Sequence, residues 1–369
     1  MVLRPEAELL LCNARTDSSF QRSEQIKTLL RRDIDWDYLF QAAQRHGVVP
    51  LLYHFLDETY SELIPGTVSN QLQELCQNNT KINLFLTAEL LKLLNLFEEN
   101  GVPAIPYKGP ALAASIYGDI ALRQFVDLDI LVRKRDVLKV KELLVAHGCQ
   151  PELDLTPAQE KPFLDFHYDY AFLCSNKRVL VEIHWEVTEG FLSFPLDTER
   201  LWERLEPVEI AGKRVLTLSA EDSLLIVCAH SSKHLWERLG WICDVARLVE
   251  SHKHIDWERV LKNAIALGGE RMLLLGLYLA HDLLGTSLPE SILKRSQSDA
   301  LVRYLAERVC KRLFGNKTRS PGMFESAIFH LKMRERLADR IRYCRRLALT
   351  TTVRDWSLLP LPRYLFFLY

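Results

Sequence analysis

The sequence predicts an α+β fold in which a small mixed-sheet core lies between an N-terminal and a C-terminal helical lobe. Three observations predict it. Apolar residues recur at the three-and-four spacing of helices from residue 6 to about residue 101. Short apolar or alternating runs, typical of strands, follow in residues 102–187, and helical spacing returns after Ser219. We therefore expect three parts, residues 1–101, 102–218 and 219–369.

The N-terminal part is predicted to be helical throughout. Two of its apolar stripes are Ile26, Leu29 and Leu30, then Leu39, Ala42 and Ala43. A further helix is predicted to begin at Thr87, a residue type that caps helices, and to end at Asn100 and Gly101.

The central part is predicted to alternate strands and helices. In chain order we expect a strand over 102–107, a helix over 110–117, a strand over 125–132, a helix over 136–147, and strands over 170–174 and 178–187. The last two strands flank Ser175, Asn176 and Lys177, which predict a hairpin turn.

The C-terminal part begins with Ser219, a predicted helix cap, and Asp222 three residues later. It also contains a short stretch that repeats a pattern of the N-terminal part, which we call the echo. Ile34-Asp35-Trp36 with Ala43 and Gly47 matches Ile255-Asp256-Trp257 with Ala264 and Gly268 at identical spacing. In both places Asp is expected to cap a helix whose first turn buries Trp. We attach no function to this echo.

Composition excludes several classes of protein. The 47 Lys and Arg residues offset 48 Asp and Glu residues, for a net charge of −1, so a global basic surface for nucleic acid is absent. The hydrophobic share of 48% and charged share of 26% are those of a globular protein. No apolar run reaches the ~20 residues of a membrane span, and no signal peptide is evident.

The eight cysteines are far apart and form no CxxC pair. In a chain of this size, scattered thiols predict reduced core residues of a cytoplasmic protein, with neither a disulfide framework nor a zinc site.

Three acidic residues carry the candidate chemistry. Asp127 and Asp129 are two apart on a predicted strand, so their carboxylates project from one face. Such a pair repels unless a cation lies between its members, and hard oxygen ligands suit Mg²⁺. Glu182, on a later strand, can supply a third carboxylate for a two-metal site. The alternative is that the Asp pair is only the solvent face of a half-buried strand.

A phosphate-binding turn is predicted just before this pair. Lys108 and Gly109, followed by Pro110, mark a strand-to-helix junction whose helix amides attract phosphate, and Lys108 adds a positive charge. An ordinary turn with a solvent lysine is the alternative. The conjunction of this turn with carboxylates on two later strands predicts a nucleoside triphosphate site.

These residues carry a resemblance to a known family. The segment from Tyr107-Lys-Gly-Pro-Ala-Leu-Ala-Ala to Arg123 and Asp127-Leu-Asp-Ile-Leu-Val resembles the uncharacterised nucleotidyltransferase family of the polymerase-β-like superfamily, whose pattern is KGxALAxxxYxDxxxRxxxDxDLLV. The later Val181-Glu-Ile-His-Trp also resembles this family, as do His230-x-x-Lys-His and Trp241-x-x-Asp. The Lys-Gly turn stands where the wider superfamily usually has Gly-Ser, and Glu182 stands where relatives commonly have Asp.

The resemblance implies an Mg²⁺-dependent nucleotidyltransferase that moves a nucleoside monophosphate from an NTP, for example ATP, to an acceptor hydroxyl and releases pyrophosphate. Two Mg²⁺ ions are expected. The catalytic and metal-binding residues are assigned as Asp127, Asp129 and Glu182, and the substrate-binding residues as Lys108, Gly109, Arg123, His184, Lys233 and His234. The acceptor is expected to be a small molecule, a saccharide or a peptide, with nucleic acid less favoured.

Several assignments have alternatives. Arg123 holds a phosphate or sugar edge, or it forms a surface ion pair with Asp119. Lys233 and His234 contact nucleotide or acceptor, or they are the polar edge of an amphipathic helix. Zinc at His230 and His234 is disfavoured because Lys233 repels a cation.

Two further residues are secondary candidates. Asp169 is a fallback third metal ligand. Asp244 is expected to bond an N–H group or an Arg.

Positions 303–346 of the C-terminal part contain 13 basic and only 4 acidic residues, a feature with two interpretations. This segment binds RNA, another polyanion or nucleotide phosphates, or it is a solvated helix face. The apolar tail, residues 358–369, is expected to dock on the protein or on a partner. Competing functions are a non-catalytic nucleotide- or partner-binding module and a toxin-like enzyme that modifies RNA or protein.

Overall fold

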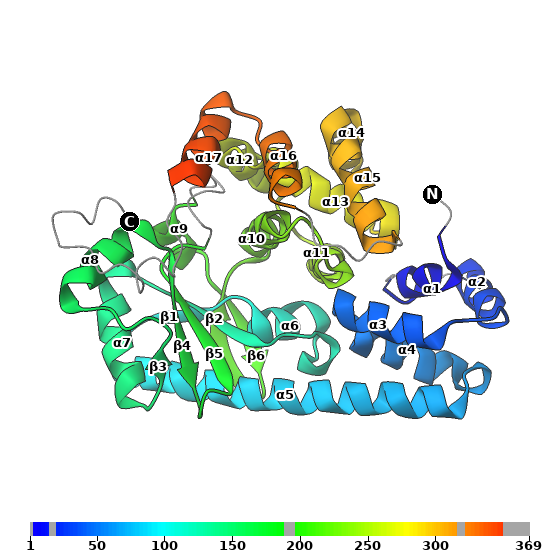
Figure 1. Cartoon of the computed structure of the whole chain (residues 1–369), viewed down its shortest axis with the longest axis horizontal. Helices are drawn as coiled ribbons and strands as arrows, with labels where there is room; N and C mark the ends of the chain where they lie inside the picture. Colours follow the sequence, from blue (N-terminus) through cyan, green and yellow to red (C-terminus); the bar gives the residue numbers. More distant parts are fainter. Residues whose placement is uncertain (1–2, 15–19, 188–195, 316–321, 350–369) are drawn as a thin grey trace. The chain divides into compact units, whose positions relative to one another are not determined.

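The computed structural model describes residues 3–14, 20–187, 196–315 and 322–349, and Figure 1 shows the arrangement of its elements. The strands are β1 Ala104–Pro106, β2 Asp127–Val132, β3 Gln150–Pro151, β4 Asp169–Cys174, β5 Val179–His184, β6 Glu206–Ile210 and β7 Lys213–Thr217. The helices are α1 Pro5–Ala14, α2 Phe20–Leu30, α3 Trp36–His46, α4 Val49–Tyr60, α5 Gly66–Glu99, α6 Gly109–Tyr117, α7 Val137–Ala146, α8 Pro157–Phe166, α9 Thr198–Trp202, α10 Ala220–Lys233, α11 Leu239–Ser251, α12 Trp257–Leu267, α13 Glu270–Leu284, α14 Glu290–Ser298, α15 Ala300–Phe314, α16 Met323–Met333 and α17 Leu337–Leu349. Short 3-10 helices are η1 Ser61–Leu63, η2 Ile120–Leu122 and η3 Lys134–Asp136.

The chain forms two compact units, each built from discontinuous segments. The first, which we call the helical unit, comprises Met1–Leu84, Ala113–Gln124 and Ala220–Arg334. The second, which we call the sheet unit, comprises Phe85–Leu112, Phe125–Ser219 and Glu335–Tyr369. The division into three lobes at residues 101 and 218 stays a prediction.

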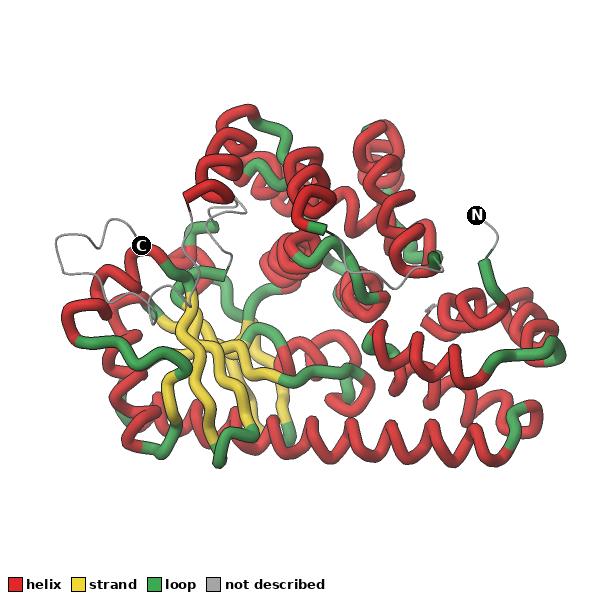
Figure 2. Tube along the Cα trace, viewed as in Figure 1, coloured by secondary structure: helices red, strands yellow, loops and turns green. Residues whose placement is uncertain are grey.

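The sheet unit contains a five-stranded mixed sheet in the order β1-β2-β5-β4-β3 (Figure 2). Only β2 and β5 are parallel to each other, and the other neighbours are antiparallel. The fold class predicted from the sequence, a mixed sheet with helical regions before and after it in the chain, is therefore confirmed. The parallel pair places Asp129 opposite Glu182 in register.

The hairpin predicted between the last two strands is also confirmed. Ser175, Asn176 and Lys177 all have positive φ, from 49° to 63°, and they reverse the chain between β4 and β5. A second hairpin, β6–β7, was not predicted. It turns at Ala211 and Gly212, again with positive φ, and forms a separate two-stranded sheet.

One sequence expectation about the cysteines is wrong. Cys149 and Cys174 form a disulfide that joins the residue before β3 to the last residue of β4. These strands are antiparallel neighbours at the end of the sheet, which brings two thiols 25 residues apart in the sequence together. The other six cysteines are outside disulfides, as expected, but only Cys12, Cys228 and Cys243 are buried in the core, whereas Cys76 and Cys310 are half-buried and Cys344 is exposed.

The helix predicted to begin at Thr87 begins earlier. α5 is a single helix of 34 residues, and Thr87 lies inside it, buried, so it caps nothing. The predicted end is correct: Gly101 adopts φ +65°, and the N–H of Val102 bonds back to the carbonyl of Phe97. A left-handed glycine is the usual way to terminate a helix.

The helical unit confirms the echo seen in the sequence. Asp35 caps α3 by accepting from the N–H of Tyr38, and Asp256 caps α12 by accepting from the N–H of Arg259. Both helices end at a left-handed glycine. The echo extends further, because a glutamate on α1 and one on α10 accept from the N–H of the respective cap. Trp36 and Trp257 are half-buried rather than buried.

None of the described helices is both long and apolar enough to cross a membrane.

Candidate active site

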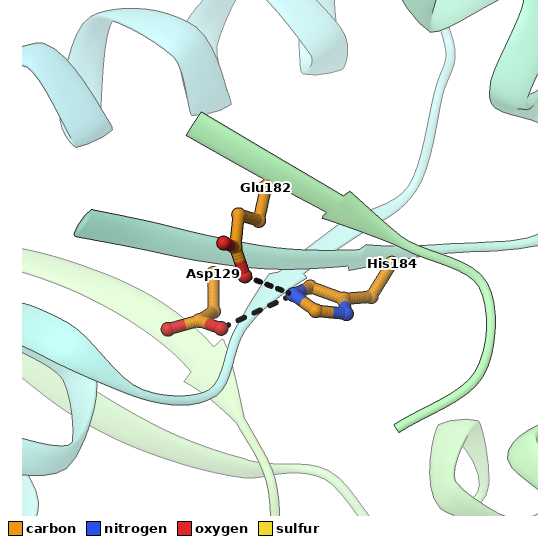
Figure 3. Close-up of side chains that lie close together, drawn as sticks. All are labelled: Asp129, Glu182 and His184. Atoms are coloured by element: carbon orange, nitrogen blue, oxygen red, sulfur yellow. Dashed lines mark hydrogen bonds and ion pairs between the residues drawn. The ribbon is translucent and has the colours of Figure 1, made fainter. Parts of the chain in front are cut away.

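The site forms on one face of the sheet, where β2 and β5 run side by side. Asp129 is paired in register with Glu182, and His184 follows two residues later on β5. Since side chains alternate along a strand, Glu182 and His184 project from the same face. Figure 3 shows both of them turned toward Asp129.

The three side chains are in direct contact. His184 Nε2 lies 3.1 Å from Asp129 Oδ1 and 3.3 Å from Glu182 Oε2, so one ring nitrogen holds both carboxylates (Figure 3). One potential ligand atom from each residue lies within 4.8 Å of the others. Among the described residues, these three side chains form the group whose geometry could hold a metal ion.

Lys108 places a positive charge next to the two carboxylates. Its Nζ donates to Asp129 Oδ1 at 2.7 Å, and both side chains are largely buried. The sequence predicted this lysine as a phosphate ligand, and the structure shows it as a counterion of Asp129. Its role toward phosphate stays a prediction.

The electrostatics of the cluster favour charged forms. Burial raises the pKa of Asp129, but the nearby Lys108 ammonium and the hydrogen bond from His184 outweigh it and lower that pKa. The same hydrogen bond lowers the pKa of Glu182. Burial lowers the pKa of His184, yet its bonds to the two carboxylates raise it to about 9. At neutral pH two carboxylates therefore face a protonated imidazole and an ammonium group.

Asp127 lies at the start of β2 on the same face and is half-buried. It is outside the group of three, although its charge contributes to the raised pKa of Lys108. Asp169, the fallback ligand, pairs in register with His184 from the neighbouring β4 and is also outside that group. The metal-binding roles of Asp127, Asp129 and Glu182 stay predictions.

The turn after β1 depends on its glycine. Gly109 has φ +50°, and a Cβ there would lie 3.2 Å from the carbonyl oxygen of Asp127. Both the backbone conformation and this close approach favour glycine. The turn that begins α6 thus lies directly against the first residue of β2, as a phosphate-binding turn next to a metal site requires.

The remaining predicted site residues belong to the helical unit. Arg123 forms a bidentate pair with Asp244, with Nε–Oδ1 3.1 Å and Nη2–Oδ2 3.0 Å, and Tyr117 also donates to Asp244. The expectation that Asp244 bonds an Arg is confirmed. The alternative partner, Asp119, caps η2 by accepting from the N–H of Ala121, and its pairing with Arg123 stays a prediction.

Lys233 and His234 lie where α10 ends. The His234 ring contacts the rings of His230 and Trp241, at centroid distances of 4.8 Å and 5.4 Å respectively. His230 and His234 lie outside the group of three possible metal ligands found among the described residues, and the expectation about zinc stays a prediction. Contact of Lys233 or His234 with a substrate stays a prediction.

Several basic residues of segment 303–346 are neutralised. Arg308 and Arg312 both pair with Glu325, and Arg342 pairs with Asp339. These contacts favour the interpretation of a solvated helix face. The apolar tail, residues 358–369, lies outside the described residues.

Sequence reasoning missed the position of His184 between the two carboxylates. The signal was present, because Glu182 and His184 are two apart on one strand. The partners of Arg123 and Lys108 were also missed, since both contacts are long-range, separated by 121 and 21 residues.

Comparison with known proteins identifies the family of the chain. No curated protein matches the chain. Two solved structures are weakly similar to the chain. One is the solution structure of the antibiotic-resistance factor ANT(2'')-Ia, at 15% identity and TM-score 0.35, covering 50% of this chain and 91% of that one. The other is the crystal structure of ANT(2")-Ia in complex with adenylyl-2"-tobramycin, at the same identity and TM-score, covering 49% of this chain and 95% of that one. The model of a family described as "Uncharacterised nucleotidyltransferase" matches residues 32–285. This match spans well over half of the chain, from before α3 to the end of α13, and so the protein belongs to the uncharacterised nucleotidyltransferase family and is an enzyme of that class.

Proposed function

We propose that the protein is an Mg²⁺-dependent nucleotidyltransferase that moves a nucleoside monophosphate from an NTP to the hydroxyl of an acceptor, with release of pyrophosphate. The observation that carries the proposal is the in-register pair of Asp129 and Glu182 on neighbouring parallel strands, next to the glycine turn before α6. Family membership gives the reaction class.

The donor set fits Mg²⁺. Carboxylate oxygens are the protein ligands that Mg²⁺ prefers, and it usually takes one or two of them together with substrate phosphates. Asp129 and Glu182 supply such oxygens within reach of one cation, and Asp127 adds a third carboxylate on the same strand face. Bound there, two Mg²⁺ ions would stabilise the charge on the α-phosphate and on the leaving pyrophosphate.

The role of Lys108 and His184 depends on whether a metal ion is bound at the carboxylates. In the metal-free site they neutralise Asp129 and Glu182. A divalent cation at these carboxylates makes two buried positive charges redundant, because like charges repel at short distance. With a cation held there, Lys108 would be available to contact the phosphates at the Gly109 turn, which would reconcile its observed ion pair with its expected phosphate contact.

His184 stays on the same face and orients Glu182 through its Nε2 atom, so it acts as a positioning residue toward the substrate. We also retain Arg123, Lys233 and His234 as substrate-binding residues. We place the enzyme in the cytoplasm, because the reaction needs a compartment that supplies NTP and Mg²⁺. ATP is our first candidate for the NTP, and a small molecule, a saccharide or a peptide is our candidate acceptor.

Incubation with labelled NTPs and Mg²⁺ against separate small-molecule, RNA and protein pools tests the proposal. We expect pyrophosphate release and label on the small-molecule, saccharide or peptide fraction, with both lost in Asp127→Asn. Label on RNA or on intact protein would support the toxin-like alternative. Tight NTP binding without pyrophosphate release against any pool would contradict the enzyme proposal and favour a binding module.

A further inference from the structure

We propose that the Tyr107 hydroxyl binds the nucleotide in the candidate active site, by donating a hydrogen bond to an oxygen of the α-phosphoryl group. The inference rests on the proposed function for the identity of the substrate, and it adds a residue that the proposed function leaves unused. Tyr107 is the first residue after β1 and directly precedes Lys108 and Gly109. It is 3% exposed.

Tyr107 lies on the same face of the sheet as the two carboxylates. β1 runs antiparallel to β2 with Pro106 opposite Ile130. Tyr107, one residue further along, therefore lies opposite Asp129, and its backbone N–H donates to the Asp129 carbonyl at 3.4 Å. Directly opposed residues of an antiparallel pair project from one face. The Tyr107 side chain thus shares the face of Asp129 and of Glu182, which pairs with Asp129 from β5.

The ring of Tyr107 is held in place across this face. It packs edge-on against the His184 ring, with 5.4 Å between the two ring centroids. Since His184 lies on β5 and β2 separates β1 from β5, the tyrosine side chain reaches over β2. Lys108 Nζ lies 5.1 Å from the centroid of the same tyrosine ring. These contacts fix the direction of the hydroxyl.

The hydroxyl is buried and has no hydrogen-bond partner within the described part of the chain. The same is true of Nδ1 of His184, the residue that Tyr107 contacts. The neighbouring carboxylates bond to Lys108 and His184 instead. A buried polar group without a partner costs free energy, so native proteins keep few of them, and each needs a functional or structural reason. Two such atoms in one pair of touching side chains, beside Asp129, point to a ligand.

The surroundings of the hydroxyl favour an oxygen of the α-phosphoryl group. Burial, followed by the charges of Asp129 and Glu182, raises the pKa of the Tyr107 hydroxyl well above its usual value, so the phenol stays protonated and remains a donor. Under the proposed function, the α-phosphate lies at these carboxylates and the other two phosphates lie at the Gly109 turn. A neutral donor suits this position, because it bonds a phosphate oxygen without the repulsion that another lysine or arginine exerts on a cation.

Tyr107→Phe tests the proposal, because it removes the hydroxyl and keeps the ring. One matched control is Tyr60→Phe in the helical unit, where the hydroxyl is also buried without a partner among the described groups. The other is Tyr170→Phe on β4, where the buried hydroxyl donates to the Leu153 carbonyl at 2.8 Å.

Thermal unfolding without ligand gives the first readout. We expect Tyr107→Phe and Tyr60→Phe to melt at or above the wild-type temperature, because each loses a hydroxyl that gains nothing from burial. Tyr170→Phe is expected to melt below it, because it leaves a carbonyl unpaired. A melting temperature of Tyr107→Phe below that of wild type would show that its hydroxyl is already bonded in the free protein, and would overturn the inference.

Calorimetric binding to the full-length protein gives the second readout. The probes are the α,β-methylene analogues of ATP, GTP, CTP and UTP, which cannot release pyrophosphate, and pyrophosphate itself, each with Mg²⁺. We expect Tyr107→Phe to bind the analogue that wild type prefers at least about tenfold more weakly, the loss of one hydrogen bond to a charged group. Its affinity for pyrophosphate, which lacks the α-phosphoryl group, is expected to equal that of wild type. Tyr60→Phe keeps both affinities.

Three binding results would overturn the inference: equal affinity of Tyr107→Phe and wild type for the analogue, an equal loss of affinity for pyrophosphate, or no analogue binding by wild type up to about 10 mM. The inference and the proposed function fail separately. Weaker analogue binding by Tyr107→Phe, with no transfer to any acceptor pool, upholds the inference and rejects the transfer reaction. Transfer by wild type, with unchanged analogue binding by Tyr107→Phe, does the reverse.

Discussion

Asp129 and Glu182 lie opposite each other on adjacent parallel strands, and a single ring nitrogen of His184 contacts both carboxylates. This relationship explains how two acidic side chains lie close together on one face of the sheet. Buried carboxylates need a positive partner, and here His184 and Lys108 supply it. The site is therefore charge-balanced before any cation arrives, and changes to one partner affect the others.

Asp129→Asn is expected to destabilise the protein as well as stop transfer. Removal of the buried negative charge leaves Lys108 and His184 facing one remaining carboxylate, and uncompensated buried charge costs about 3 kcal/mol. Thermal unfolding with and without the substitution measures this loss. Asp127→Asn, at a half-buried position, is expected to stop transfer with the melting temperature unchanged.

A matched control for the Asp129 prediction is Asp165→Asn. Asp165 pairs with Lys134 at 2.9 Å, but both side chains are exposed, so the expected loss is about 0–1 kcal/mol. In addition, Lys108→Met combined with Asp129→Asn is expected to recover part of the stability, because it removes the unpaired ammonium. Equal melting temperatures for Asp129→Asn and Asp165→Asn would show that the cluster does not carry stability.

His184 is expected to titrate near pH 9 in the metal-free protein, because its bonds to Asp129 and Glu182 favour the protonated ring. The direction of the effect on stability follows from the linkage between protonation and folding. A pKa raised above its unfolded value of about 6.5 gives stability that is complete below that pH and is lost as the pH rises through 9. NMR titration of the imidazole measures the pKa directly.

Glu182→Gln and Mg²⁺ should both lower the pKa of His184, the first by removing a carboxylate and the second by adding positive charge beside the ring. An imidazole that titrates near 6.5 in the metal-free wild type would contradict the geometry of the cluster.

Acid is expected to destabilise the helical unit through His46. Burial lowers the pKa of this histidine to about 4, so the folded protein keeps it neutral at a pH where the unfolded chain is protonated. Stability is therefore complete above about pH 6.5 and falls as the pH drops toward 4, by about 3 kcal/mol. Urea unfolding at a series of pH values measures the loss.

His46→Gln removes the titrating group and is expected to flatten that part of the pH profile. His254→Gln, at an exposed position, is the control and should leave the profile as in wild type. A profile of equal slope in His46→Gln and wild type would assign the acid sensitivity to other groups.

Local sequence patterns predicted where helices and strands occur better than they predicted how long these elements are. The strand periodicity around Asp129 and the hairpin at Asn176 were correct because each depends on a few neighbouring residues. α5 was cut short at Thr87 because a capping residue type carries no information on whether its helix has already begun. The mixed sheet followed from the order of elements.

The residues of the candidate site could be predicted from the sequence, but the contacts between them could not. The spacing placed Asp127 and Asp129 on one face of a strand and Glu182 on a later strand, and the structure brings Asp129 and Glu182 together. The ion pair of Arg123 with Asp244 and the disulfide of Cys149 with Cys174 could not be predicted, because each joins distant segments whose approach depends on tertiary packing.

The disulfide provides the last prediction. A bridge between residues 25 apart restricts the unfolded chain and is worth about 3 kcal/mol. We expect a reducing agent to lower the melting temperature of the wild type and to have no effect on the Cys149→Ser and Cys174→Ser double variant, which melts at the reduced value. Cys344→Ser, at an exposed free thiol, should respond to the reductant as the wild type does. Because the bridge lies at the β3–β4 end of the sheet while Asp129 and Glu182 lie on β2 and β5, its reduction is expected to lower stability and leave the NTP reaction rate unchanged. A transfer rate that falls with the reductant in wild type and not in the double variant would instead link this edge of the sheet to catalysis.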